Sequence, residues 1–325
     1  MADVLAIVAP GQGAQTPGFL SPWLQLPTFA ARIGRLSEVV GVDLARMGSE
    51  ADADTIRDTA VAQPLLVAAG VAVAAELSTT GEPTVSSPPV GLLAGHSVGE
   101  LTAATLAGVL SPETAMTLVR ERGKAMAEAA TTRPTSMAAV VGGDPDEVRA
   151  AIEAAGLTPA NNNGPGQVVA GGTVEQVEQL TANPPRRARV MPLSVAGAFH
   201  TVHMAPAVEH LRPLADAAEA QDPTVTLLSN ADGQAVASGR EYVGRLVSQI
   251  ASPVRWDLCM ETMAALGVTG LLELTPAGTL TGIAKRHLRT AELFALNTPD
   301  QIDEARAFCD RHAGEPAPQP QEDPA

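Results

Sequence analysis

The sequence has 325 residues, of which 45% are hydrophobic and 2% aromatic, and its formal net charge is −15. This length fits one large α/β domain or two ordinary domains, with a core filled mainly by Ala, Val and Leu. The acidic balance argues against a nucleic-acid-binding protein, which needs a cationic surface. The two cysteines, Cys259 and Cys309, are too few for a disulfide framework and lack metal-ligand spacing.

The apolar segments favour a protein that does not enter a membrane. Gly, Pro or charge interrupts each run, so we expect none to reach the roughly 18 residues of a membrane span. Residues 1–9 predict a buried strand and not a signal peptide, because no basic segment precedes the apolar residues. We therefore expect a cytoplasmic protein.

Short apolar runs alternate with helical patterns along the chain, which is typical of a parallel α/β sheet. The expected strands of this sheet are 4–9, 90–94, 225–229, 268–274 and 293–296. The expected helices between them are 60–77, 100–109, 114–130 and 241–249. The fold class is therefore α/β.

The segment 131–193 has a different order of elements. Its expected strands are 136–141, 159–163, 167–170 and 188–193, and its expected helices run from 144 to 155 and onward from 173. Asp144 is expected to cap the first helix and Pro145 to begin it. This βαββαβ order predicts a small ferredoxin-like subdomain inserted into the larger sheet.

We therefore expect three parts in the chain. Residues 1–130 and 194–312 form the catalytic core, and residues 131–193 form the inserted subdomain. Residues 313–325 contain four prolines and three acids with few apolar residues. Such a composition predicts a disordered tail.

Gly95-His-Ser-Val-Gly99 matches the G-x-S-x-G pattern of a nucleophile elbow. In such an elbow, glycines flank a tight turn, and the serine hydroxyl is held at a helix N-terminus whose N–H groups favour an oxyanion. A plain tight turn is the alternative. The expected strand before the motif and the expected helix after it favour Ser97 as a nucleophile.

A nucleophilic serine needs a base, and histidine is the usual one. His96 is a poor candidate, because neighbours on such a turn point apart from Ser97. His200 lies where the chain returns from the inserted subdomain to the core, and it is either the base or a hydrogen-bonded loop histidine. His203 and His210 follow on an expected helix, at positions typical of solvated or capping side chains.

The third member of a catalytic triad has no clear candidate. The only aspartates between Ser97 and His200 are Asp144 and Asp146, and both begin a helix of the inserted subdomain. We therefore expect a Ser–His dyad in which a neutral group orients the base.

Arg122 interrupts the apolar face of the expected helix 114–130, which Ala115, Leu118, Ala125 and Met126 share by their spacing. An arginine in this position is either part of a structural ion pair or a binding group for an anion. The sequence leaves both possibilities open.

Gly11-Gln-Gly-Ala-Gln15 follows the first expected strand. It has neither the spacing nor the lysine of a phosphate-binding loop. Its glycines allow close approach of the backbone to another group, and we favour an oxyanion-hole amide here.

Six segments in the same order resemble the malonyl-CoA:acyl carrier protein transacylases of bacterial fatty-acid and polyketide synthesis. The resemblance covers about nine tenths of the chain. The segments are Ala9-Pro-Gly-Gln-Gly-Ala-Gln15, Gly95-His-Ser-Val-Gly-Glu100, Arg120-Glu-Arg-Gly123, Asn161-Asn-Asn-Gly-Pro-Gly-Gln167, Gly197-Ala-Phe-His200 and Gln249-Ile-Ala-Ser-Pro-Val-Arg-Trp256. Each is weak alone, but together they are specific.

The resemblance implies an α/β-hydrolase-like parallel-sheet core with the ferredoxin-like insert. It implies that Ser97 is the nucleophile and His200 the base. It also implies that the main-chain carbonyl of Gln249 orients His200, which accounts for the missing acid. The backbone N–H groups of Gln12 and Val98 would form the oxyanion hole.

The family match also implies how the acyl group is chosen. Arg122 would pair with the malonyl carboxylate. Phe199 resembles the residue of malonyl-selective members, whereas methylmalonyl-selective relatives usually have serine there. The segment 272–278 departs from the Gly-Pro-Gly that the family often has, which affects the expected loop geometry and not the chemistry.

The implied reaction moves a malonyl group from coenzyme A to the phosphopantetheine thiol of an acyl carrier protein through an ester on Ser97. No metal or redox cofactor is expected. The motifs leave two rivals, a hydrolase on the same elbow and a catalytically silent module that binds a carrier protein.

The carrier protein is itself acidic, so docking on this acidic chain requires a local basic patch. Two clusters qualify, Arg186 with Arg187 and Arg189, and Lys285 with Arg286 and Arg289. The alternative interpretation is that both clusters are solvated loop charges.

Overall fold

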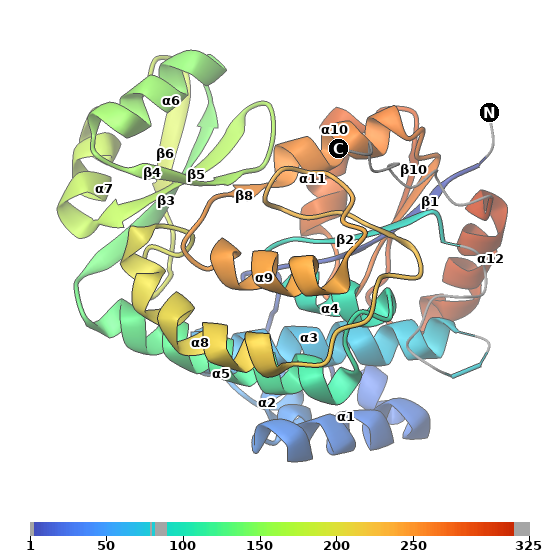
Figure 1. Cartoon of the computed structure of the whole chain (residues 1–325). Helices are drawn as coiled ribbons and strands as arrows, with labels where there is room; N and C mark the ends of the chain where they lie inside the picture. The colour runs from blue at the N-terminus through green and yellow to red at the C-terminus, as the bar shows by residue number, and fades with distance from the viewer. Residues whose placement is uncertain (1–2, 79, 82–89, 315–325) are drawn as a thin grey trace, which may run out of the picture.

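The computed structural model describes residues 3–78, 80–81 and 90–314, which form two sheets surrounded by helices (Figure 1). The first sheet is parallel throughout, with the strand order β10-β9-β1-β2-β7. Its strands are β1 (Leu5–Ala9), β2 (Leu92–Gly95), β7 (Thr226–Leu227), β9 (Gly270–Glu273) and β10 (Glu292–Ala295). All five overlap the strands expected from the apolar runs.

Helices cover both faces of this sheet. They are α1 (Pro27–Val40), α2 (Leu44–Ser49), α3 (Thr59–Leu77), α4 (Gly99–Leu106), α5 (Pro112–Thr131), α8 (Ala205–Ala217), α9 (Gly239–Gln249), α10 (Trp256–Ala265), α11 (Thr279–His287) and α12 (Ile302–His312). Short 3₁₀ helices span Trp23–Gln25, Thr55–Arg57, Val202–Met204 and Pro299–Gln301.

Successive side chains of β1 point to opposite faces of the sheet, and their contacts show which helices cover each face. Leu5 and Ile7 join the larger apolar cluster, which includes residues of α3, α4, α5 and α12. Ala6 and Val8 point the other way and pack with α10 and α11. Both faces of a central parallel strand are therefore buried, as its continuous apolar run predicts.

The second sheet has the strand order β6-β3-β5-β4-β8. Its elements are β3 (Thr135–Gly142), α6 (Pro145–Ala154), β4 (Thr158–Asn162), β5 (Gln167–Thr173), α7 (Val174–Ala182) and β6 (Ala188–Pro192), followed much later by β8 (Val254–Arg255). Strands β3 to β6 pair antiparallel. The chain order of these elements, βαββαβ, is the expected one.

Local signals in the sequence explain where the helices of the second sheet begin. The Asp144 carboxylate accepts hydrogen bonds from the N–H groups of Asp146 and Glu147 at the start of α6. Thr173 and Gln176 form a reciprocal capping box at the start of α7.

Strand β8 was not expected. It pairs in parallel with β4, so residues 254–255 extend the second sheet. A two-residue strand carries no period, and the sequence therefore gives no signal for it.

Helix α3 corrects the expectation about membrane spans. By length and composition alone it could cross a membrane, in spite of its internal Pro64 and Gly70. In the folded chain, 83% of its apolar window is buried, and its residues belong to the larger apolar cluster. We therefore describe it as a core helix. Of the expected tail 313–325, residues 315–325 lie outside the described part of the chain.

Candidate active site

Ser97 sits on a sharp turn between β2 and α4. Its φ angle is 54°, in the left-handed region that residues other than glycine seldom adopt. A Cβ on Gly95 would collide with the backbone of Gly99, and a Cβ on Gly99 would lie 2.8 Å from the Pro10 carbonyl oxygen and nearer still to that of Ala9. The two glycines are thus required by close backbone approach, and the turn they permit exposes the serine hydroxyl.

His200 lies against the serine. The distance from Ser97 Oγ to His200 Nε2 is 2.7 Å, and that from His200 Nδ1 to the Gln249 carbonyl oxygen is 2.8 Å. Because a carbonyl can only accept, Nδ1 carries the proton and Nε2 is free to accept the serine hydroxyl. His200 also has a positive φ of 60°. Strained backbone of this kind gathers at functional sites.

Burial keeps the imidazole neutral. His200 is only 3% exposed, and this burial, followed by the nearby positive charge of Arg122, lowers its pKa to about 3. A neutral imidazole at pH 7 has the protonation state required of a general base.

Two backbone N–H groups next to the serine have no acceptor. Within the part of the chain that the structure describes, the N–H groups of Gln12 and Val98 donate no hydrogen bond. The N–H of Ser97 itself is occupied, because it donates to Asn230 Oδ1 at 2.8 Å. The Gln12 side chain is anchored by Nε2 contacts of 3.2 Å to the Arg57 carbonyl and to Thr59 Oγ1.

Arg122 on α5 is 2% exposed, and its guanidinium group lies beside the Ser97 hydroxyl. Its Nη1 donates to Gln63 Oε1 at 2.7 Å, while its Nη2 donates to Gln249 Oε1 at 3.0 Å and lies 3.4 Å from Ser97 Oγ. Burial lowers its pKa to about 10, an effect that the charge of Glu100 partly offsets.

No carboxylate among the described residues forms an ion pair with Arg122. The structural ion pair left open by the sequence is therefore absent from this part of the chain. Neutral amide oxygens hold the guanidinium instead, and a buried cation without a paired anion is a strong site for an anionic ligand.

A cavity of about 450 Å³ opens in front of Ser97. Ser97, His200 and Gln12 line it, together with Phe199, which is 7% exposed. Met137, Asn161 and Val169 of the second sheet also line the cavity, as does Leu193, just after β6.

The other histidines considered in the sequence lie away from the serine hydroxyl. His96 Nε2 is 2.9 Å from Asn163 Oδ1, and the ring packs edge-on against Trp256. His203 is half-buried in a 3₁₀ turn, and His210 is exposed beside Glu121. Asp144 and Asp146 remain at the start of α6, as expected.

Two buried residues of the site were missed by the sequence reasoning. Asn230, just after β7, accepts from the Ser97 N–H through Oδ1 and donates from Nδ2 to the Gly95 carbonyl at 2.8 Å. Glu100, at the start of α4, accepts from the backbone N–H of Asn230 at 2.6 Å. The available signals were a polar residue at the end of a buried strand and an acid inside a matched motif.

Metal chemistry has no evident ligand set here. The described residues contain no group of three or more His, Cys, Asp or Glu side chains able to hold a metal ion.

Comparisons with known proteins agree over nearly the whole chain. The family model for the acyl transferase domain matches residues 7–310. The chain is 48% identical over 301 residues to the malonyl CoA-acyl carrier protein transacylase of Mycobacterium tuberculosis (strain H37Rv), a match that covers 93% of this chain and 99% of the relative. It is 34% identical over 304 residues to the protein of the same name from Escherichia coli (strain K12), covering 91% and 97%.

Solved structures give the same picture. The crystal structure of MCAT from Mycobacterium tuberculosis matches with a TM-score of 0.89 at 48% identity, covering 93% of this chain and 99% of that one. A second match, with a TM-score of 0.87 at 31% identity, covers 94% and 99%. It is a malonyl-transacylase in complex with its type II PKS acyl-carrier protein.

Proposed function

The chain belongs to the acyl transferase family, among the malonyl CoA-acyl carrier protein transacylases, and we propose that it transfers malonyl groups through an ester on Ser97. The donor is malonyl-CoA and the acceptor is the phosphopantetheine thiol of an acyl carrier protein. One observation carries the proposal: a buried guanidinium that has no ion-pair partner among the described residues lies 3.4 Å from the hydroxyl of a Ser–His dyad.

In the first half-reaction, Ser97 Oγ attacks the thioester carbonyl while His200 Nε2 takes the hydroxyl proton. The 2.8 Å contact to the Gln249 carbonyl supports this role, because it holds the ring with Nε2 toward the serine. The carbonyl oxygen then carries negative charge, which the vacant N–H groups of Gln12 and Val98 stabilise. The C–S bond breaks, and the coenzyme A thiolate receives the proton from His200.

In the second half-reaction, the carrier thiol attacks the malonyl ester. His200 takes the thiol proton and returns it to Ser97 Oγ as the C–O bond breaks. Thioester, ester and thioester follow one another with no change of oxidation state, so the proposed chemistry requires no redox cofactor. The roles that a metal could fill, proton removal and stabilisation of the oxyanion, are assigned here to His200 and to the N–H groups of Gln12 and Val98.

Arg122 selects the acyl group by its carboxylate. A malonyl group and an acetyl group differ by this one charge, and a guanidinium can bind both carboxylate oxygens at once. A bound acetyl group would leave the buried cation unpaired, which disfavours it. Phe199, which lines the cavity, is proposed to contribute to the choice between malonyl and larger acyl groups.

The topology also supports a finer description of the fold. We propose an α/β-hydrolase-like core from 1–130 and 194–312, and a ferredoxin-like subdomain at 131–193. The strand order β6-β3-β5-β4 and the βαββαβ chain order support the second assignment. The two cysteines are buried as free thiols, which agrees with the proposed cytoplasmic location.

Intact-mass and peptide mass spectrometry test the proposal. After brief exposure to malonyl-CoA, we expect a malonyl adduct on Ser97 that is stable without carrier protein and moves to the carrier when it is added. Ser97→Ala should abolish the adduct. Release of free malonate in the absence of carrier would instead identify a hydrolase, and an adduct on another residue would contradict the assigned nucleophile.

A further inference from the structure

Glu100 is a buried acid that the proposed reaction does not use. It lies three residues after the nucleophile, in the first turn of α4, and is 1% exposed. Its carboxylate does not line the cavity. A buried carboxylate is costly unless it is well hydrogen-bonded, so its partners indicate what it does.

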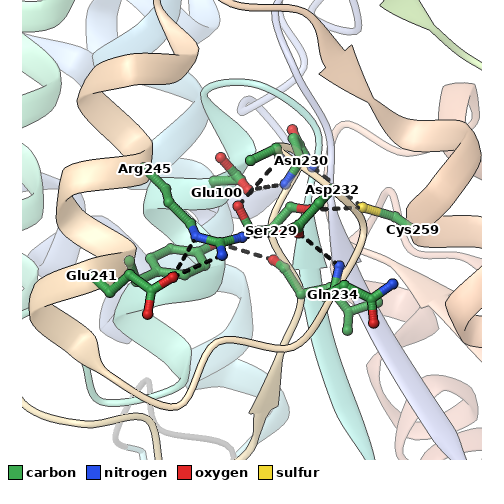
Figure 2. Close-up of polar contacts among 11 residues, drawn as sticks. Glu100, Ser229, Asn230, Asp232, Gln234, Glu241, Arg245 and Cys259 are labelled. Atoms are coloured by element: carbon green, nitrogen blue, oxygen red, sulfur yellow. Dashed lines mark hydrogen bonds and ion pairs between the residues drawn. The ribbon is translucent and has the colours of Figure 1, made fainter. Parts of the chain in front are cut away.

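Both carboxylate oxygens of Glu100 accept hydrogen bonds from residues of the site. Oε1 accepts from the backbone N–H of Asn230, and Oε2 accepts from the side-chain amide of Gln249. Figure 2 shows Glu100 beside Asn230, with Cys259 on one side and Arg245 with Glu241 on the other. Arg245 is held by Asp232 and Glu241 and makes no direct contact with the Glu100 carboxylate.

The contact with Gln249 fixes which way its amide points. A glutamine amide has one donor end and one acceptor end. Glu100 and Asn230 Oδ1 both accept from the NH₂ end, so the oxygen end must face Arg122, whose Nη2 donates to it at 3.0 Å. Gln63 holds the other terminal nitrogen, Nη1, at 2.7 Å. Two amide oxygens therefore aim the guanidinium, and Glu100 determines the orientation of one of them.

We propose that Glu100 is a positioning residue that acts through the Gln249 amide to aim Arg122 at the acyl group on Ser97. The proposal rests on the proposed function, since it assumes an acyl group with a carboxylate. Glu100 itself does not touch the substrate.

If Glu100 acted only through its charge, removing that charge would change malonyl binding in the opposite direction. A negative charge on Glu100 repels a second carboxylate bound at Arg122, so removing that charge would strengthen malonyl binding. Burial raises the pKa of Glu100 to about 8, while the hydrogen bond from the Asn230 N–H, the charges of Arg122 and Arg245 and the Tyr242 hydroxyl act against that rise. An N–H donor faces each carboxylate oxygen, which is the arrangement that an ionised carboxylate requires. The positioning role predicts weaker malonyl transfer when the carboxylate becomes an amide, and the electrostatic role predicts a lower KM.

Glu100→Gln is the central variant. A carboxamide has a single acceptor atom where Glu100 uses two, so one donor loses its partner or Gln249 flips its NH₂ group toward Arg122. We expect kcat/KM for malonyl-CoA to fall roughly tenfold to a hundredfold, the factor typical of one unpaired buried polar group. Acylation by acetyl-CoA, which has no carboxylate to be aimed at, should change by less than about threefold. Glu100→Asp keeps both acceptors and should recover part of the loss.

Gln249→Ala tests whether Glu100 acts on Arg122 through the Gln249 amide. If Glu100 acts through this amide, the double variant should be no worse with malonyl-CoA than Gln249→Ala alone, whereas independent effects would add. The alanine variant keeps the main-chain carbonyl that contacts His200.

Glu273 provides a matched control. It is also fully buried, and its carboxylate accepts from the N–H groups of Gly278, Leu280 and Thr281 and from the Thr281 hydroxyl at the start of α11. None of these partners belongs to the site. Glu273→Gln should alter the melting temperature but leave the ratio of malonyl to acetyl acylation unchanged.

The outcomes separate the possibilities. A lower KM for malonyl-CoA in Glu100→Gln, an equal loss with both donors, or additive effects with Gln249→Ala would each overturn the positioning role. If Glu100→Gln fails to fold, Glu100→Asp and Gln249→Ala still report the malonyl-to-acetyl ratio. The malonyl adduct on wild-type Ser97 is measured alongside, and its absence would contradict the proposed function independently of Glu100.

Discussion

The cavity has two unlike walls. On the core side, Ser97 and His200 belong to a buried network of hydrogen bonds that continues to Arg122 and Gln249. On the insert side, the wall is mainly apolar, with side chains such as Met137 and Val169. A hydrogen bond from His96 Nε2 to Asn163 Oδ1 joins this side of the cavity to the elbow.

The difference between the two walls follows from the direction of the strands in the two sheets. In the parallel sheet, β1, β2 and β7 are adjacent, and the residues that follow them include Gln12, Ser97 and Asn230. Parallel strands end at one edge, so backbone N–H groups and side chains converge there. Strands β3 to β6 of the second sheet pair antiparallel and offer no such edge, and the side chains that they add to the cavity are mainly apolar. We therefore expect core changes to affect chemistry and insert changes to affect binding.

The largest expected effect is on the rate of Ser97 acylation, and it distinguishes a core variant from insert variants. His200→Ala should lower the rate of Ser97 acylation by about 10⁴-fold or more, because the hydroxyl loses its base. Asp144→Asn and Asp146→Asn, in the insert, should change that rate by less than about threefold, since the Asp144 carboxylate only caps α6 and Asp146 lies in the first turn of that helix. Single-turnover acylation by malonyl-CoA gives both rates. An aspartate as important as His200 would show that the dyad is really a triad.

The second-largest expected effect concerns the choice between malonyl-CoA and acetyl-CoA as donors. Arg122→Ala should lower kcat/KM for malonyl-CoA by about two to four powers of ten, which corresponds to roughly 3–5 kcal/mol for a charge left without its buried partner. Transfer of acetyl should be kept or increased. Arg122→Lys should recover only part of the loss, because an ammonium cannot bind both carboxylate oxygens in a planar fork.

The control for Arg122 is the acetyl donor itself, measured with each variant together with the melting temperature. A parallel fall with both donors would mean that the guanidinium supports the fold through Gln63 and Gln249 and does not select the acyl group.

Most strands and the helices α3 to α9 could be predicted from the sequence because apolar runs and helical periods are local signals. Ser97 could be located for the same reason, since the elbow is one short motif with its strand and helix beside it. Helices α1, α2, α10, α11 and α12 were not expected. Boundaries were less accurate where few residues pair, as at β7, which spans only Thr226–Leu227. Strand β8 has no period at all and was missed.

The buried network could not be predicted, because its members are far apart in the chain. Glu100, Asn230 and Gln249 meet only after β2, β7 and α9 have packed together. Glu100 lies 130 residues before Asn230 and 149 before Gln249, and such separations leave no periodic pattern. The positive φ angles of Ser97 and His200 were equally hidden, since neither residue type favours that conformation.

The smallest expected effect concerns the carrier protein, and it again compares core with insert. One basic cluster, Lys285, Arg286 and Arg289, lies at the end of α11 and just beyond it. The other, Arg186, Arg187 and Arg189, lies at the start of β6. All six side chains are exposed, and none forms an ion pair with a described residue. Both clusters are therefore free to attract an acidic partner.

Position favours the α11 cluster. Arg286 and His287 border a small hollow with Asn163 and Gln167, and Asn163 is the residue bonded to His96 beside the nucleophile. Changing Lys285, Arg286 and Arg289 together to Glu should raise KM for the carrier protein roughly tenfold and flatten its salt dependence. The malonyl-CoA half-reaction should change little, because chemistry at Ser97 is untouched.

The matched reversal of Arg186, Arg187 and Arg189 should have a smaller effect on the carrier KM, since β6 is the outer strand of the insert sheet. Steady-state rates at several salt concentrations, with carrier protein varied, measure both triple variants. A larger effect from the β6 cluster would place the docking surface on the insert. Equal damage to the coenzyme A half-reaction would mean that the α11 charges hold the donor nucleotide and do not steer the carrier, because a carrier-docking patch acts only after coenzyme A has left.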